Sequence, residues 1–221
     1  MPNARISSTL NLRIPQISMP ATASERKDSG MTTQEQTAVT PPTAPVAPAG
    51  INHLVLNVKD IERAHAFWSG ILGFRQCGEL ADRPGITMRF YRGDSGSHHD
   101  LALMQVQNPD TVQDPGDEWN MGARKTGINH VAIKWPSREA WLQEIAFLQS
   151  KGVVFHRRVD HGMTHSVYIS DPDGHGIEVL YELPEEIWSG DVNAALNYAK
   201  TLPSEGPEAL QDDTEYKVFG G

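Results

Sequence analysis

Three residues whose types suit metal binding stand out in the sequence: two histidines and one glutamate. His53 and His130 end two copies of the same four residues, because Gly50-Ile51-Asn52-His53 recurs as Gly127-Ile128-Asn129-His130. Glu178 lies in a run of apolar residues, where a carboxylate is costly to bury unless a partner balances its charge. Two histidines and one carboxylate form the three-ligand set typical of non-haem iron(II) oxygenases, which keeps coordination positions open for other molecules.

The repeated histidines also admit a structural interpretation. A single histidine in a strand more often makes an ordinary hydrogen bond than it binds a metal, and the repeat could simply preserve an Asn-His pair in both copies. Matched positions for His53 and His130, together with an isolated Glu178, favour the metal site.

The two copies continue with the same pattern of elements, starting with a short β-rich run and then an amphipathic helix. Asp60 and Ser137 are good N-caps for the two helices. Apolar residues recur on one face of each helix: Ile61, Ala64, Trp68 and Ile71 in the first, and Trp141, Ile145 and Leu148 in the second.

Three strand-like segments follow each helix. They are residues 74–80, 86–91 and 99–106 in the first copy, and residues 153–158, 166–169 and 177–181 in the second. Each copy is therefore predicted to be a βαβββ unit, in an α+β fold. One such unit leaves a sheet face uncovered, so we expect the two to pair in a curled mixed sheet around a metal cavity. His53 and His130, on the first strands, would converge there.

The ordered domain is predicted to span residues 50–183, with units at about 50–107 and 127–183. Residues 1–49 are rich in Ser, Thr, Ala and Pro and are expected to be a disordered extension. Met31 is an alternative start. Residues 184–221 form an acidic C-terminal tail with a helix-like piece at 192–199.

Composition excludes several classes of function. The 221 residues carry a formal net charge of -9 without a basic stripe, which argues against a nucleic-acid partner. No apolar run reaches the roughly 20 residues needed to cross a bilayer, so no membrane role is expected. Cys77, the one cysteine, cannot form an internal disulfide, which fits a cytoplasmic location.

The paired units with His53, His130 and Glu178 resemble the vicinal oxygen chelate superfamily, which has the glyoxalase/bleomycin resistance/dioxygenase fold. Within it, residues 50–183 resemble the compact one-domain extradiol ring-cleaving dioxygenases that act on catechol and dihydroxybiphenyl, and tail segments 194–198 and 205–210 are similar too. The resemblance implies Fe(2+), with Mn(2+) as the alternative, an aromatic diol and O₂ as substrates, and a homo-oligomer.

The same resemblance implies catalytic roles for three further residues. His99, in a segment similar to the last strand of a unit, would be the acid–base group, with its neighbour His98 as the rival. Tyr168 lies ten residues before Glu178, the spacing of a tyrosine that contacts the bound catecholate, although it could equally be a half-buried strand tyrosine. His161 resembles a catalytic His-Gly turn.

Three other activities of the superfamily remain open alternatives. Glyoxalase I-like lyases use four ligands, including a glutamate in the last strand of the first unit, and residues 100–105 contain none. Fosfomycin-modifying enzymes use two histidines and a glutamate but handle a phosphonate. Antibiotic-binding modules need no metal. His99 and Tyr168 favour the dioxygenase.

Overall fold

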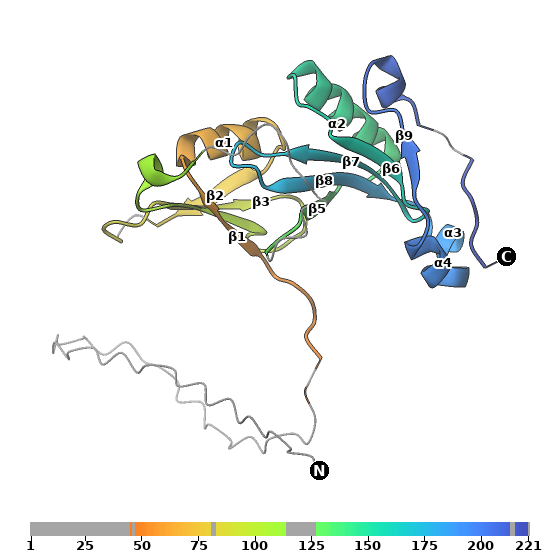
Figure 1. Ribbon diagram of the computed structural model, residues 1–221. Helices are drawn as coiled ribbons and strands as arrows, with labels where there is room; N and C mark the ends of the chain where they lie inside the picture. The colour runs from red at the N-terminus through yellow and green to blue at the C-terminus, as the bar shows by residue number, and fades with distance from the viewer. Residues whose placement is uncertain (1–44, 46, 81–82, 114–126, 213–214, 221) are drawn as a thin grey trace, which may run out of the picture. The chain divides into compact units, whose positions relative to one another are not determined.

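The computed structural model describes residues 45, 47–80, 83–113, 127–212 and 215–220 (Figure 1). The chain divides after Pro48, and Ala49–Gly221 form one compact unit. The extension at residues 1–49 and the alternative start at Met31 therefore lie almost wholly outside the described residues. The elements below all belong to the unit that begins at Ala49.

The first half of this unit is a βαβββ arrangement. Its elements are β1 (Leu54–Val58), α1 (Ile61–Gly70), β2 (Arg75–Glu79), β3 (Met88–Arg92) and β4 (Leu101–Gln105). The strand order is β1-β4-β3-β2, with β1 parallel to β4 and the other pairs antiparallel. α1 lies over this sheet in Figure 1.

The second half repeats the arrangement. Its elements are β5 (Val131–Lys134), α2 (Arg138–Ser150), β6 (Arg157–Asp160), β7 (Thr164–Ser170), β8 (Gly176–Glu182) and the added strand β9 (Lys200–Leu202). The order is β5-β8-β7-β6-β9, with β5 parallel to β8. The α+β class and the two βαβββ units are confirmed, and their strands form two mixed sheets, one in each half.

Both long helices begin where their capping residues predict. The Asp60 side chain accepts hydrogen bonds from two backbone amides of the first turn of α1, and the Ser137 hydroxyl accepts one from Ala140. Six of the seven residues predicted for the apolar faces are buried: Ile61, Ala64 and Trp68 in α1, and Trp141, Ile145 and Leu148 in α2. Ile71, the seventh, follows the last residue of α1 and is partly buried. Hydrophobic burial of these faces fixes each helix on its sheet.

Three histidines expected on strands lie instead just before them. The β1 ladder begins at Leu54, one residue after His53, and β5 begins one residue after His130. β4 begins two residues after His99. These imidazoles are therefore carried by connecting segments, whose backbone direction is not limited by the ladder to the two faces of a sheet.

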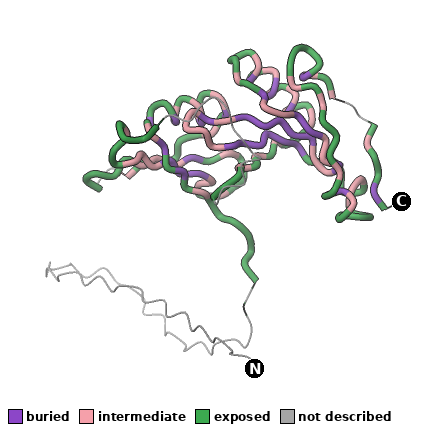
Figure 2. Tube along the Cα trace, viewed as in Figure 1, coloured by how far each residue is buried: buried purple, intermediate pink, exposed green. Residues whose placement is uncertain are grey.

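The central strands of the second sheet are covered on both faces. Nearly every residue of β7 and β8 is buried, as the continuous purple runs of Figure 2 show. Trp141 of α2 donates a hydrogen bond from its indole to the Val179 carbonyl at 3.0 Å.

The helices in the described part of the chain all lack the length and apolar character that spanning a membrane requires.

The tail, residues 184–220, packs back on the second half. It contains α3 (Glu185–Trp188), a 3₁₀ turn at Ser189–Asp191, α4 (Val192–Leu196), β9 and a 3₁₀ turn at Pro207–Leu210. α4 is shorter than the expected helix at 192–199. β9 was not expected, because three residues are too few to show an alternating pattern, and it pairs with β6.

The turn between β7 and β8 joins the two halves. The Trp68 indole of α1 donates to Asp171 Oδ2 at 3.2 Å, and the Lys59 amide donates to Asp173 Oδ1 at 2.9 Å. His175 Nδ1 lies 2.9 Å from the same Asp171 oxygen. This turn leads directly into β8, so the contact with α1 helps to place Glu178.

Candidate active site

Glu178 lies on β8, an interior strand of the second sheet. It lies opposite Ala132 of β5 on one side and opposite Tyr168 of β7 on the other. Side chains directly opposite each other in an antiparallel pair are close enough to interact, so the hairpin itself brings Tyr168 to Glu178. The Tyr168 hydroxyl donates to Glu178 Oε1 at 2.8 Å.

Two histidines complete this group, which we name the His130 cluster: His130, Glu178, Tyr168 and His161. His130 Nε2 lies 3.1 Å from Glu178 Oε2, and His161 Nε2 lies 2.9 Å from the Tyr168 hydroxyl oxygen. Glu178 and Tyr168 are buried. Since the phenol has one proton and gives it to Glu178, His161 must donate to the phenol through a protonated Nε2.

The electrostatics of the cluster agree with these hydrogen-bond directions. Burial, followed by the charge of Glu178 and the hydrogen bond to it, raises the pKa of Tyr168 above its ordinary range. Burial lowers the pKa of His161. At neutral pH, Tyr168 is therefore a neutral phenol and His161 a neutral imidazole.

The Asn-His repeat makes the same local contact twice. Asn52 Oδ1 lies 2.8 Å from His53 Nδ1, and Asn129 Oδ1 lies 2.8 Å from His130 Nδ1. An amide oxygen at Nδ1 accepts that proton and directs Nε2 outward, which is the arrangement of metal-binding histidines. In the second half, the outward Nε2 meets the Glu178 carboxylate.

His53 belongs to a different group, the His53 cluster, which consists of His53, His98 and His99. The ring centroids of His53 and His99 are 4.4 Å apart, and the Nδ1 atoms of His98 and His99 are 2.5 Å apart. Burial lowers the pKa of His99, and the neighbouring imidazoles add to that effect. His53 also lines a cavity of roughly 550 Å³, together with the residues just before β1 and the residues of β5.

The six predicted site residues thus fall into two places. His130, Glu178, Tyr168 and His161 are brought together, whereas His53 lies with His99. Across the described ranges, no three His, Cys, Asp or Glu side chains are arranged to hold a metal ion. The described residues therefore assemble two of the three expected ligands, His130 and Glu178, at one place.

A small cavity lies beside the His130 cluster. Its volume is about 260 Å³, near the low end of the roughly 300–1,000 Å³ of small-molecule sites. Polar and apolar side chains line it: His161, Met163, Thr164, Tyr168, Glu178, Leu180 and Leu196. The polar side chains can exchange protons with a ligand, and the apolar ones can contact a hydrocarbon group.

Two features of this site were not expected from the sequence. The direct Tyr168–Glu178 pair follows from a hairpin whose centre is Asp173, midway between them, so the Asp-Pro-Asp-Gly turn contained the signal. Leu196, on α4, comes from the tail, and nothing in its local sequence links it to the cluster.

Residues 50–179 match a family model described as the Glyoxalase/Bleomycin resistance protein/Dioxygenase superfamily. The chain is similar to a protein of Bacillus subtilis named catechol-2,3-dioxygenase, with 26% identity over 163 residues, or 74% of this chain and 51% of that protein. The chain thus spans about half the length of that relative.

A second relative has a different activity in its name. Lactoylglutathione lyase of Pseudomonas putida is 28% identical over 154 residues, which cover 60% of this chain and 85% of the lyase. Among solved structures, a glyoxylase/bleomycin resistance protein/dioxygenase domain from Frankia matches 62% of this chain and 100% of its own, with 14% identity and a TM-score of 0.49.

Proposed function

We propose that this chain, which belongs to the Glyoxalase/Bleomycin resistance protein/Dioxygenase superfamily, is an extradiol dioxygenase that opens catechol-type rings at a bound divalent metal, iron(II) in the first instance. The observation that carries the proposal is the His130 cluster, in which a carboxylate, a buried phenol and a neutral imidazole line one cavity. The similarity to the Bacillus subtilis dioxygenase supports it.

The proposed metal ligands are His130, Glu178 and His53. The imidazole and carboxylate atoms of the first two suit iron(II) or manganese(II), and they lie 3.1 Å apart. In the part of the chain that the structure describes, His53 does not lie beside His130 and Glu178, and no three such side chains are arranged to hold a metal ion. Such a metal would supply activation of O₂ and a template for the diol.

The residues of the cluster handle protons. A catechol must lose a proton on binding and receive one back as the ring opens, and a neutral imidazole can do both near pH 7. His161 donates through Nε2 to Tyr168, so its Nδ1 is the basic nitrogen available to a substrate. Tyr168 stays protonated, and its oxygen can accept a hydrogen bond from a hydroxyl group of the diol. His99, whose ring lies beside that of the proposed ligand His53, is the second acid–base candidate.

The proposed reaction balances without a further reductant. The carbon–carbon bond next to the diol breaks, and both atoms of O₂ enter the ring-opened product. Substituted catechols are the proposed class of substrate, because Met163, Leu180 and Leu196 give the cavity apolar lining that a ring substituent can contact. A catechol has no net charge before binding, so the cavity needs no cationic side chain to attract it.

A lactoylglutathione lyase activity is the second candidate, because the Pseudomonas putida enzyme matches over 85% of its own length. The register of the two sheets argues against a four-ligand site. Glu178 lies opposite Ala132, and the corresponding pair in the first half is Ala102 opposite Val55. Alanine thus occupies the position where a second carboxylate ligand would lie.

Anaerobic reconstitution with Fe(II), followed by air and a panel of catechols, tests the proposal. We expect a yellow ring-opened product, and at least about a hundredfold loss of turnover in Glu178→Gln, because the glutamine amide has no negative charge to balance a metal ion. Glu182→Gln, on the same strand at the surface, is the matched control. Absence of product with every catechol, together with isomerisation of a glutathione hemithioacetal, would establish the lyase instead.

A further inference from the structure

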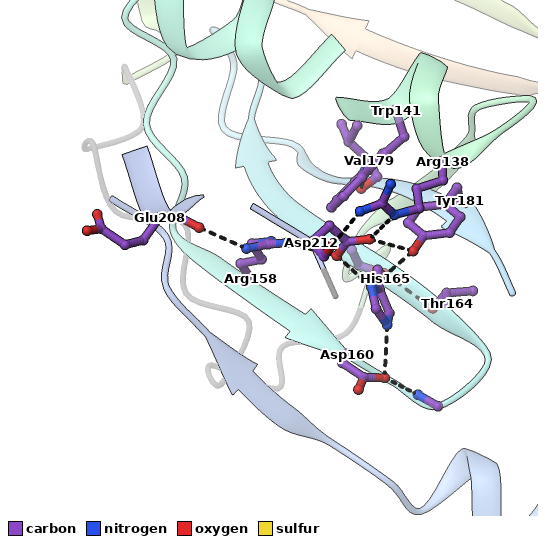
Figure 3. A network of polar contacts seen from close by, with 12 residues as sticks. Arg138, Trp141, Arg158, Asp160, Thr164, His165, Val179, Tyr181, Glu208 and Asp212 are labelled. Carbon is purple, nitrogen blue, oxygen red and sulfur yellow. Dashed lines mark hydrogen bonds and ion pairs between the residues drawn. The ribbon is translucent and has the colours of Figure 1, made fainter. Parts of the chain in front are cut away.

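A buried group of charged side chains lies on the face of the second sheet opposite to the His130 cluster. His165 is three residues before Tyr168 on β7, and Tyr181 is three residues after Glu178 on β8, so each pair projects to opposite faces. Figure 3 shows these side chains gathered below α2 around one carboxylate of the tail, Asp212.

Asp212 contacts four elements of the second half. Its Oδ1 lies 2.7 Å from His165 Nδ1 and 2.9 Å from Arg158 Nη2, and its Oδ2 accepts from the Tyr181 hydroxyl at 2.6 Å and from Arg138 Nε at 3.0 Å. The Asp212 side chain is fully buried. A buried carboxylate with this many charged and polar partners holds its segment in one place.

The contacts of Asp212 continue to the turn that carries His161. His165 Nε2 lies 3.4 Å from Asp160 Oδ1, an ion-pair distance, and the same oxygen accepts a hydrogen bond from the Gly162 amide at 2.8 Å. Burial alone lowers the pKa of His165, but its two carboxylate neighbours raise it to about 9. At neutral pH His165 is an imidazolium held between Asp212 and Asp160.

The tail also covers this turn directly. Gly162 has a φ of 75°, and a Cβ added to it would lie 2.6 Å from the ring of Phe219. The Phe219 amide donates to the Ile187 carbonyl at 2.8 Å, and the Phe219 and Tyr198 rings meet edge to face. The backbone next to His161 is therefore fixed from two sides by residues of the tail.

We propose that Asp212 is a positioning residue of the site: through the His165 imidazolium and the Asp160 carboxylate, it fixes the turn that presents His161 to the Tyr168 hydroxyl. The catalytic consequence rests on the function proposed above. The geometric consequence, a rigid His161 turn that depends on the tail, does not.

Hydrogen exchange of the Gly162 amide tests the geometric part in the full chain. Asp212→Asn keeps the size of the side chain but removes its charge, and we expect Gly162 to exchange at least about tenfold faster while Leu103 of the first sheet is unchanged. Arg138→Gln is the matched control, because Arg138 contacts the other side-chain oxygen and the backbone carbonyl of Asp212 but not His165. Unchanged exchange at Gly162 in Asp212→Asn, or equal acceleration in both variants, would overturn the proposal.

Asp160→Asn removes the negative charge that faces His165 and is the alternative variant if Asp212→Asn fails to fold. Either variant should lower kcat for a catechol about tenfold with little change in KM, because His161 is displaced while the apolar residues that line the cavity, Met163, Leu180 and Leu196, stay in place. The double variant should be no slower than either single one, since residues that act as a unit are not additive. Additive losses would refute the proposal. If wild-type protein cleaves no catechol, the proposed function fails, and Gly162 exchange still decides the role of Asp212.

Discussion

The Tyr168 hydroxyl is the best single atom at which to test the His130 cluster. Replacing Tyr168 with Phe removes one oxygen atom and leaves a buried ring on β7, the strand that pairs with β6 and β8. Two contacts are lost: the hydrogen bond to Glu178 Oε1 at 2.8 Å and the hydrogen bond from His161 Nε2 at 2.9 Å.

The two lost contacts set the expected magnitude. A hydrogen bond to a charged group contributes about 1.5–3 kcal/mol, and a neutral one about 0.5–1.5 kcal/mol. Because phenylalanine is buried more easily than tyrosine, part of this loss is offset. We expect Tyr168→Phe to lower the free energy of unfolding by about 2–3 kcal/mol, which corresponds to a fall in Tm of roughly 5–10 °C for a domain of this size.

Urea denaturation measures this change, with m compared between the proteins to show that both unfold in the same way. Tyr91→Phe is the matched control in the first half. Its ring is also buried, but its hydroxyl lies 3.1 Å from the imidazole of His65, and the guanidinium of Arg89 near it is hydrogen-bonded to Glu62. The control should therefore lose only about 0.5–1.5 kcal/mol.

Equal losses in the two variants would contradict this account of the cluster. Such a result would mean that the Tyr168 hydroxyl does no more for Glu178 than an ordinary buried phenol does for its neighbour. Full ring-cleaving activity in Tyr168→Phe, with the predicted loss of stability, would separate the two roles and leave the tyrosine as a structural residue only.

Three further predictions concern other parts of the molecule. Burial raises the pKa of Glu144 to about 7. The contribution of this carboxyl group to the free energy of unfolding is therefore complete below about pH 4.5, where the group is neutral, and is lost as the pH rises through 7 and the group becomes charged. Glu144→Gln should remove this pH dependence and raise the free energy of unfolding at pH 8 by about 1 kcal/mol, as measured by urea denaturation. Gly162→Ala should cost more than about 2 kcal/mol, whereas Gly85→Ala, with a similar φ but open space around it, should lose about 1 kcal/mol. His53→Ala should prevent stoichiometric Fe(II) retention, measured by metal analysis after gel filtration, whereas His99→Gln should retain the metal and lose turnover.

Much of the fold was predictable because its signals are local. Asp60 and Ser137 mark helix starts through contacts within one turn, and both were identified correctly. The repeat of Gly-Ile-Asn-His predicted two βαβββ units, since equal sequences at equal places in two copies favour equal structures. Strand ends were less accurate, because the ladder depends on the partner strand, as at β6, which begins at Arg157 and not at residue 153.

The site was predictable only in part, for the same reason. Tyr168 and Glu178 lie on one hairpin, so their contact is set by ten residues of sequence around a recognisable turn. Asp212 contacts His165 although the two residues lie 47 positions apart in the chain, and the acidic tail contains other carboxylates that could equally have been predicted to make this contact. Its selection depends on where β9 pairs and how the tail returns, which are properties of tertiary packing.

The two halves of the molecule have the same histidine but different opposing residues. His53 and His130 each precede the first strand of their unit and each contact an asparagine at 2.8 Å. In the second half, Glu178 and Tyr168 follow on the neighbouring strands, whereas the matching positions of the first half are Ala102 and Phe90. A carboxylate at the place of Ala102 would be buried without a phenol to donate to it, at a cost of several kcal/mol. The matched positions of the two units therefore carry two imidazoles and a single carboxylate, which is the set of donors that the proposed three-ligand site requires and one fewer than a four-ligand site requires.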